Sequence, residues 1–219
     1  MLYTLESAKA NIRNREGKRV FFLGKSDQLT SEAKDFLNRE RIAILPAHEA
    51  AISQYKLLGG GYIHEKPENM THLHGDVLVR KTHPRIRFRG AMDTLEAELL
   101  LCPEVTRQIL ELARKLIRCE VMNEPVGAFT LYGLTEDAQR SRSHFPQDYY
   151  GQPHFMPDYT DKEAILRLNR ARCAARSAEL AAVEAFSDPE GNLTREDIVK
   201  ALNRMSSMLY ILMIQEKTK

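Results

Sequence analysis

Apolar residues recur at helical spacing along most of the chain after Pro84. Between 104 and 121, for example, an apolar residue returns every three or four positions, which places these side chains on one face of a helix. The same pattern predicts helices at 85–101, 104–121, 125–139, 161–186 and 194–215. Because most of the connections between these helices are short, we predict a five-helix bundle and a mainly α fold.

The chain before this region follows a different pattern. Short apolar runs at 20–23 and 42–45 predict two strands, and Thr30 is a capping residue that begins a predicted helix between them. This strand–helix–strand unit is too small to be a convincing independent domain. We therefore expect residues 1–46 to be a small α/β appendage of a larger domain.

The remaining segments complete the predicted organisation. We expect residues 47–80 to be an irregular connection, since the three glycines at 59–61 disfavour regular structure. The bundle domain then covers 81–219. Within it, residues 140–160 are rich in Ser, Pro, Tyr, Phe and His and are predicted to form a long loop. Loops of this length in compact domains are commonly functional.

Composition narrows the classes of function. The net charge is +2 over 219 residues, which gives no reason to expect nucleic acid or a membrane surface as a partner. The longest apolar run, 208–214, is far too short to span a bilayer. Three isolated cysteines favour a reducing compartment over a disulfide framework, so we expect a cytoplasmic protein.

A metal site has little support in the sequence. His64, His72, His74 and His83 lie near acidic residues, so a metal is possible there. However, no known ligand spacing connects these histidines, and isolated histidines are more often structural or exposed. We therefore name no metal ligands.

The most unusual feature of the predicted helices is a charged stripe. Arg172, Arg176 and Glu179 are spaced so that they share one side of the helix at 161–186. The same stripe carries the apolar residues Ile165, Leu168, Val183 and Phe186. We therefore expect these charges within a face that is otherwise buried. Burial of two arginines is costly unless an anion or an acidic partner meets them, so the stripe is either an anion site or a set of inter-helix salt bridges.

Two further segments contain candidate binding residues. Half of the residues at 80–89 are basic, which fits either a phosphate-binding edge or a solvated helix start. Asn203 lies beside the apolar stripe of the last helix. Its amide can hydrogen-bond a nucleobase or ribose, or cap a neighbouring helix.

Taken in order, several segments resemble the ATP:cob(I)alamin adenosyltransferase family. Residues 82–93 resemble its basic segment leading to G-x-x-D, and residues 155–157 resemble its F-x-x-P stretch. The stripe resembles its R-x3-R-x2-E motif, and residues 202–206 resemble its L-N-R-[LM]-S motif. Within the family, the ethanolamine-utilisation branch is the most similar, through 70–73, 123–125, 133–137 and 202–207.

The resemblance implies a reaction without a protein nucleophile. The 5′-deoxyadenosyl group of ATP would move to the cobalt of cob(I)alamin and release triphosphate, so ATP, Mg²⁺ and cobalamin are the expected ligands. Reduced cobalt is itself the nucleophile, and the protein would position the substrates and stabilise the leaving triphosphate.

The resemblance also implies a role for each candidate residue. Lys81, Arg85, Arg172 and Arg176 would bind the triphosphate and its magnesium. Glu179 would orient an arginine, and Asn203 would hold the adenosine. Asp93 would pair with an arginine such as Arg172 of a neighbouring subunit, because family members are trimers with sites between subunits. Phe155 would pack on the corrin and displace its lower ligand.

Further expectations concern the setting of the protein. The implied partners are a reductase and the cobalamin-dependent ammonia-lyase that this protein would supply. The implied location is the cytoplasm or the inside of a bacterial microcompartment. One departure concerns 47–69, which has no cysteine where that branch carries a Cys-Cys-x-x-Cys metal cluster. The alternative function is a non-catalytic helical bundle that docks into a microcompartment.

Overall fold

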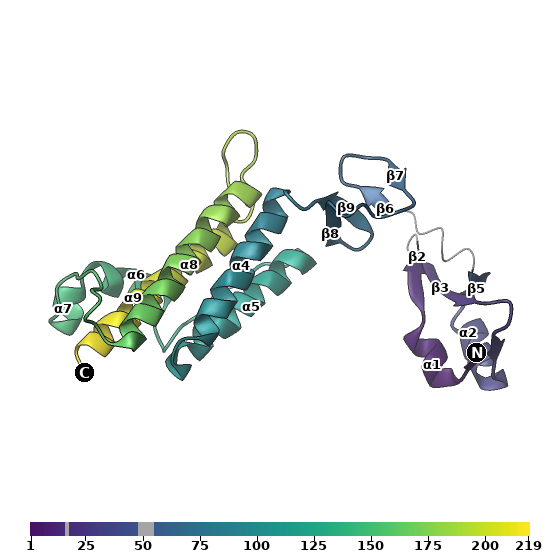
Figure 1. Ribbon diagram of the computed structural model, residues 1–219, viewed down its shortest axis with the longest axis horizontal. Helices are drawn as coiled ribbons and strands as arrows, with labels where there is room; N and C mark the ends of the chain where they lie inside the picture. The colour runs from purple at the N-terminus through teal and green to yellow at the C-terminus, as the bar shows by residue number, and fades with distance from the viewer. Residues whose placement is uncertain (16–17, 48–54) are drawn as a thin grey trace. The chain divides into compact units, whose positions relative to one another are not determined.

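The computed structural model describes residues 1–15, 18–47 and 55–219. The chain forms two compact units, Met1–Leu78 and Val79–Lys219 (Figure 1). Helices dominate, which confirms the predicted mainly α class. None of the helices among the described residues is both long enough and apolar enough to cross a membrane.

The first unit begins with a small sheet and two helices. A parallel pair of strands, β3 and β5, places Val20 opposite Ala43, and α2 connects them. Thr30 caps α2 by accepting a hydrogen bond from the backbone of Ala33. Phe21 and Leu37 are fully buried between the sheet and the helices. The elements are β1 Leu2–Tyr3, α1 Leu5–Ala10, β2 Arg13–Arg15, β3 Lys18–Leu23, β4 Gln28–Leu29, α2 Ser31–Arg39 and β5 Ala43–Pro46.

The segment expected to be irregular contains a second sheet. Its strands are β6 Tyr55–Leu57, β7 Tyr62–Ile63, β8 Met70–His74 and β9 Val77–Arg80, in the order β7-β6-β9-β8. The expectation was therefore wrong for 55–80, while 48–54 lie outside the described residues. Each strand has only two to five residues, too few for an alternating pattern to stand out from the glycines.

The second unit is built on the long helices α4, α5, α8 and α9 (Figure 1). α8 packs against both α4 and α9, and α5 packs on α4. A shorter helix, α6, packs on α9. The helices are α4 Pro84–Leu100, η1 Glu104–Thr106, α5 Arg107–Met122, α6 Glu136–His144, α7 Pro146–Tyr150, α8 Glu163–Phe186 and α9 Glu196–Lys217.

One predicted helix is displaced along the sequence. The third was expected at 125–139, but the chain is non-helical up to Thr135, which caps α6 through the backbone N–H of Ala138. Gly127 and Gly133 have φ angles of 69° and 74°, in the left-handed region that ends a helix. The predicted loop at 140–160 is consequently shorter, because α6 and α7 continue to Tyr150 and only the chain after it is without regular structure.

Candidate functional site

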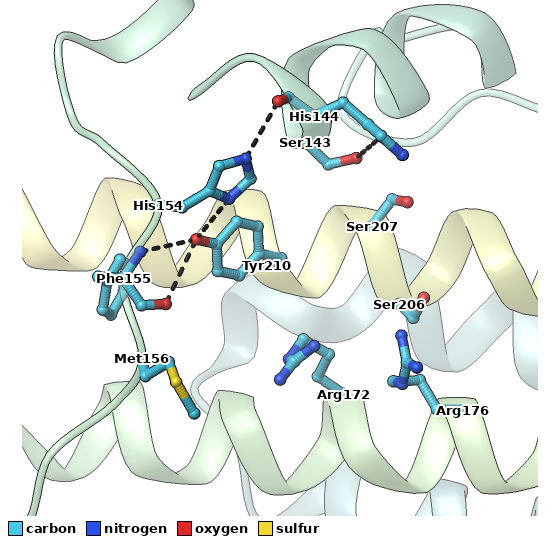
Figure 2. Close-up of a pocket in the computed structure, with 10 residues that line it drawn as sticks. All are labelled: Ser143, His144, His154, Phe155, Met156, Arg172, Arg176, Ser206, Ser207 and Tyr210. Atoms are coloured by element: carbon cyan, nitrogen blue, oxygen red, sulfur yellow. Dashed lines mark hydrogen bonds between the residues drawn. The ribbon is translucent and has the colours of Figure 1, made fainter. Parts of the chain in front are cut away.

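An open cavity of about 430 Å³ lies where α8, α9 and the chain after α7 meet (Figure 2). Its floor is formed by side chains of α8 and α9, and one wall is the extended chain around Phe155. The lining residues are Ser143, His144, His154, Phe155, Met156, Arg172, Arg176, Ser206, Ser207 and Tyr210. Cationic, hydroxyl and aromatic groups therefore share one recess.

Both arginines of the predicted stripe line this cavity. Arg172 is half-buried and donates from Nε and Nη2 to Asn169 Oδ1, at 3.2 Å each. Its guanidinium lies 5.8 Å from the ring centroid of Tyr210. Arg176 is exposed and, within the described residues, makes no hydrogen bond or ion pair. Neither guanidinium is thus neutralised by a carboxylate, and the cavity has an excess of positive charge.

The expectation that the charges interrupt a buried face was wrong. Between Leu168 and Phe186 the buried residues of α8 are all alanines, namely Ala171, Ala174, Ala175, Ala178 and Ala182. These small side chains let α4 and α9 approach α8 closely. Arg172 and Arg176 lie at the edge of this face, because the buried positions in this part of the helix are Ala171 and Ala175, each one residue before an arginine. Their charges therefore remain accessible to a ligand.

The structure brings Glu179 and Asn203 together. Asn203 donates from Nδ2 to Glu179 Oε1 at 3.0 Å and accepts from Arg204 Nη1 at 2.5 Å. Arg204 is 6% exposed, and its Nε has no hydrogen-bond partner among the described residues. In this structure Glu179 thus contacts the amide of Asn203, whereas we expected it to orient an arginine.

Phe155 lies at the cavity wall, where sequence reasoning placed a corrin contact. Its ring stacks on Tyr210, with centroids 5.9 Å apart and an angle of 28° between the planes. Lys217 Nζ lies 5.5 Å from the same ring. The phenylalanine and both arginines thus line one cavity, although the three residues come from separate segments.

The basic segment 80–89, which runs into the start of α4, has two parts with different surroundings. Lys81 is exposed, whereas Arg85 and Arg89 both contact Glu120, which is fully buried on α5. Arg85 Nε donates to Glu120 Oε1 at 2.6 Å, and Arg89 Nε donates to Oε2 at 2.8 Å. For these two arginines, neither a phosphate edge nor a solvated helix start describes the arrangement. They form an interior ion cluster with Glu120.

This ion cluster is far from the cavity within one chain. At the start of α4, Phe88 contacts Phe186, with ring centroids 5.4 Å apart. Phe186 follows Arg176 by ten residues on α8, which is about 15 Å along the helix axis. The structure therefore does not bring Arg85 together with Arg176. Asp93 is also outside the cavity: it is exposed on α4 and makes no ion pair within the described residues.

The histidines considered as metal ligands are dispersed or otherwise engaged. His72 Nδ1 lies 3.0 Å from the carbonyl oxygen of Gly75, and the ring packs on Tyr55. His83 caps α4 by accepting from the backbone N–H of Arg85. Among the residues that the structure describes, no three His, Cys, Asp or Glu side chains form a metal-binding group.

The cap at His83 predicts a pH effect on stability. Partial burial, together with the charges of Arg85 and Arg89, lowers the pKa of His83 below its usual 6.5. Below pH 6.5 the unfolded chain therefore binds more protons at this position, and the stabilising contribution is lost as the pH falls through the folded pKa.

We expect His83→Asn, which keeps a capping side chain without a titrating group, to weaken this pH dependence. Urea unfolding of both proteins at pH 7.5 and 5.0 measures the effect. Wild type should lose more stability on acidification than the variant. Equal losses would show that His83 is not responsible.

This geometry defines a class of protein: a helical protein with an open cavity that is lined by cationic and aromatic side chains. The chain belongs to the cobalamin adenosyltransferase family, whose sequence model matches residues 61–216. This finding confirms the resemblance drawn from the motifs.

Two relatives illustrate the similarity. The corrinoid adenosyltransferase EutT of Salmonella typhimurium (strain LT2) is 31% identical over 163 residues, which cover 71% of this chain and 61% of that protein. The EutT protein of Escherichia coli (strain K12) is 30% identical with the same coverage. The chain thus spans about three fifths of the length of these relatives. No solved structure matches the chain.

Sequence reasoning missed several residues of the cavity, above all Tyr210. Tyr210 follows Asn203 by seven residues on α9, which is two helical turns. That spacing places both residues on one side of the helix, so the signal was present. His154 directly precedes Phe155 and is also at the cavity wall. Ser206 and Ser207 lie in the 202–207 segment that resembles the family, but neither was given a role.

Proposed function

We propose that the protein transfers the 5′-deoxyadenosyl group of ATP to the cobalt of cob(I)alamin, forming adenosylcobalamin and releasing triphosphate. The observation that carries this proposal is the cavity, where two guanidinium groups that have no carboxylate partner among the described residues lie beside Phe155. Such a cavity fits a polyanion and a large apolar ring at once. Membership of the family supports the same reaction.

The chemical step needs positioning and charge stabilisation. The cobalt electron pair attacks C5′ of ATP, a cobalt–carbon bond forms, and the C5′–O bond breaks with its electrons going to triphosphate. Arg172 and Arg176 would stabilise the negative charge that develops on the leaving triphosphate. Both side chains point from α8 into the cavity in Figure 2, as this role requires.

Glu179 and Asn203 would hold the adenosine part of ATP. The Asn203 amide has a second N–H and a second lone pair beyond its contacts with Glu179 and Arg204. These groups are available to a ribose hydroxyl or a base nitrogen. Mg²⁺ would enter with the triphosphate, because at nucleotide sites it is held by phosphate oxygens and one or two carboxylates.

Phe155 would pack against the corrin and displace its lower axial ligand. Without that ligand, less electron density reaches the cobalt, so its reduction to the nucleophilic state is easier. The position of Phe155 beside the arginine cavity supports this role. Met156, which is 90% exposed next to it, adds apolar surface for the ring.

The site would be completed by a neighbouring subunit in a homotrimer. Lys81 lies in the turn just before α4 and Arg85 in its first turn, about 15 Å or more from Arg176 along α8, so one subunit alone does not assemble all the predicted triphosphate ligands. Lys81 would reach ATP across the interface, and Arg85, held by Glu120, would fix the segment that carries Lys81. Asp93, exposed on α4, would pair with Arg172 of the neighbour.

The wider organisation follows the same family. We propose that α4, α5, α6, α8 and α9 make up a five-helix catalytic bundle over 81–219. Residues 1–46 would be its appendage, and residues 47–80 would contact the nucleotide. The similarity to EutT proteins supports a role in ethanolamine utilisation, in the cytoplasm or a microcompartment, with a reductase and a cobalamin-dependent ammonia-lyase as partners.

The proposal predicts stoichiometric product formation. Purified protein, MgATP and cobalamin kept in the Co(I) state by a chemical reductant under strict exclusion of oxygen should give adenosylcobalamin and triphosphate in a 1:1 ratio. The corrinoid is followed by its absorbance, and the triphosphate by chromatography. If no adenosylcobalamin forms under these conditions, the enzyme function is wrong and a non-catalytic docking bundle becomes the better explanation.

A further inference from the structure

We infer that Tyr210 is a positioning residue that holds Phe155 in the orientation needed to displace the lower ligand of the corrinoid. The inference rests on the proposed function, and it assigns a role to a residue that the sequence motifs did not mark. It is carried by the hydrogen bonds and ring contacts around Tyr210, which are drawn in Figure 2.

Phe155 has no helix or strand to fix it. It lies in the extended chain between the end of α7 at Tyr150 and the start of α8 at Glu163. Its backbone N–H instead donates to the hydroxyl oxygen of Tyr210, at 3.0 Å. Tyr210 belongs to the middle of α9, most of whose residues are buried. This hydrogen bond therefore attaches the loop that carries Phe155 to a well-packed helix.

The direction of each hydrogen bond around Tyr210 follows from the acceptors. His154 Nε2 lies 3.0 Å from the carbonyl oxygen of His144, which can only accept, so Nε2 carries a proton. In a neutral imidazole the Nδ1 atom is then an acceptor. The one hydroxyl proton of Tyr210 thus has two acceptors, this Nδ1 atom at 3.1 Å and the carbonyl oxygen of Phe155 at 3.4 Å, and we assign it to the nearer one. The hydroxyl oxygen remains free to accept from Phe155. One hydroxyl thus fixes two consecutive residues of the loop.

The ring of Tyr210 adds a second connection. The ring stacks on that of Phe155, with ring centroids 5.9 Å apart, and the Arg172 guanidinium carbon lies 5.8 Å from the centroid of the Tyr210 ring. Tyr210 therefore touches the residue proposed for the corrin and a residue proposed for the triphosphate. The ring and the hydroxyl are separable by mutation, because phenylalanine keeps the ring and removes only the hydrogen bonds.

The test compares two corrinoids in Tyr210→Phe. Cobinamide lacks the lower-ligand base of cobalamin, so no base has to be displaced before it reacts. We expect the kcat for cobalamin to fall about tenfold, the size of effect of one or two lost hydrogen bonds, while turnover of cobinamide falls far less. With cob(II)alamin and saturating MgATP, the absorbance of the variant should show a smaller fraction in the base-off form.

Two comparisons make the result specific. Tyr149→Phe removes the same hydroxyl from a tyrosine that bonds Ser141 at 3.0 Å and does not line the cavity, and it should behave as wild type with both corrinoids. In Phe155→Ala, adding Tyr210→Phe should cause little further loss with cobalamin, since the hydroxyl acts through Phe155.

The position of Phe155 can also be followed without any reaction. Amide hydrogen exchange should be slow at Phe155 in wild type and faster in Tyr210→Phe, with the melting temperature unchanged. Equal losses for cobalamin and cobinamide, an unchanged base-off fraction, or unchanged exchange at Phe155 would each overturn the inference. If wild type adenosylates neither corrinoid, the proposed function fails instead, and the exchange measurement still decides whether Tyr210 holds the loop.

Discussion

Arg176→Ala should abolish most of the adenosyl transfer while leaving the protein folded. The side chain is exposed, lines the cavity and is without a partner among the described residues, so its removal breaks no internal contact. If it stabilises the leaving triphosphate, its loss should lower kcat by about 10²- to 10³-fold, as for other preorganised donors. The measurements are the initial rate of adenosylcobalamin formation and the thermal unfolding curve.

The matched control is Arg170→Ala on the same helix. Arg170 is 69% exposed and pairs with Glu98 on α4, away from the cavity. Its charge does not face the cavity, so activity should stay close to wild type, whereas stability should fall because Glu98, only 16% exposed, is left without its partner. Stability of Arg176→Ala should be equal or slightly higher, because two arginines one turn apart repel by a few tenths of a kcal/mol. Activity near wild type in Arg176→Ala would reduce the stripe to a structural feature.

Glu120→Gln should destabilise the helical unit strongly. Glu120 is fully buried and accepts from Arg85 and Arg89, which are only 24% and 21% exposed in their side chains. The glutamine keeps the shape but leaves two half-buried guanidinium groups without a counter-charge. Removing one partner of a buried ion pair costs about 3–5 kcal/mol. For a chain of this size, 3 kcal/mol corresponds to a decrease in Tm of about 6–12 °C.

Glu111→Gln on the same helix separates burial from charge. Glu111 is 62% exposed and pairs with Arg107 one turn earlier, so its substitution should change the free energy of unfolding by less than about 0.5 kcal/mol. Circular dichroism during thermal unfolding measures both variants. A Tm for Glu120→Gln within about 2 °C of wild type would contradict a stabilising role for the cluster.

The helices that pack over their full length were predictable from periodicity. Apolar spacing located α5, α8 and α9 to within a few residues, because burial of one face sets that spacing. The third helix was misplaced because Gly127 and Gly133 end regular structure by conformation, and the apolar pattern continued through them. Likewise, the strands of residues 55–80 are held by pairing between distant segments, such as Lys56 with Val77, which local patterns do not reveal.

For the candidate site, sequence motifs indicated some residues and not others. Arg172, Arg176 and Phe155 were marked as candidates, and the structure places them around one cavity. The partner of Arg85 was not predictable, because Glu120 is 35 residues away in the chain and meets Arg85 only through the packing of α4 on α5. The helical spacing from Asn203 could have marked Tyr210 as a cavity residue, but its contact with a loop 55 residues earlier arises only in the folded chain.

The alanine face of α8 has a consequence for what substitutions on this helix can change. One edge of the helix is occupied by arginines that line the cavity, while the neighbouring face carries small residues that neighbouring helices touch. Changes on the arginine edge alter what the cavity attracts and leave the packing intact, whereas any larger side chain on the alanine face must push two helices apart. Substitutions on two adjacent sides of one helix can therefore alter the charge of the cavity and the packing of the unit independently of each other.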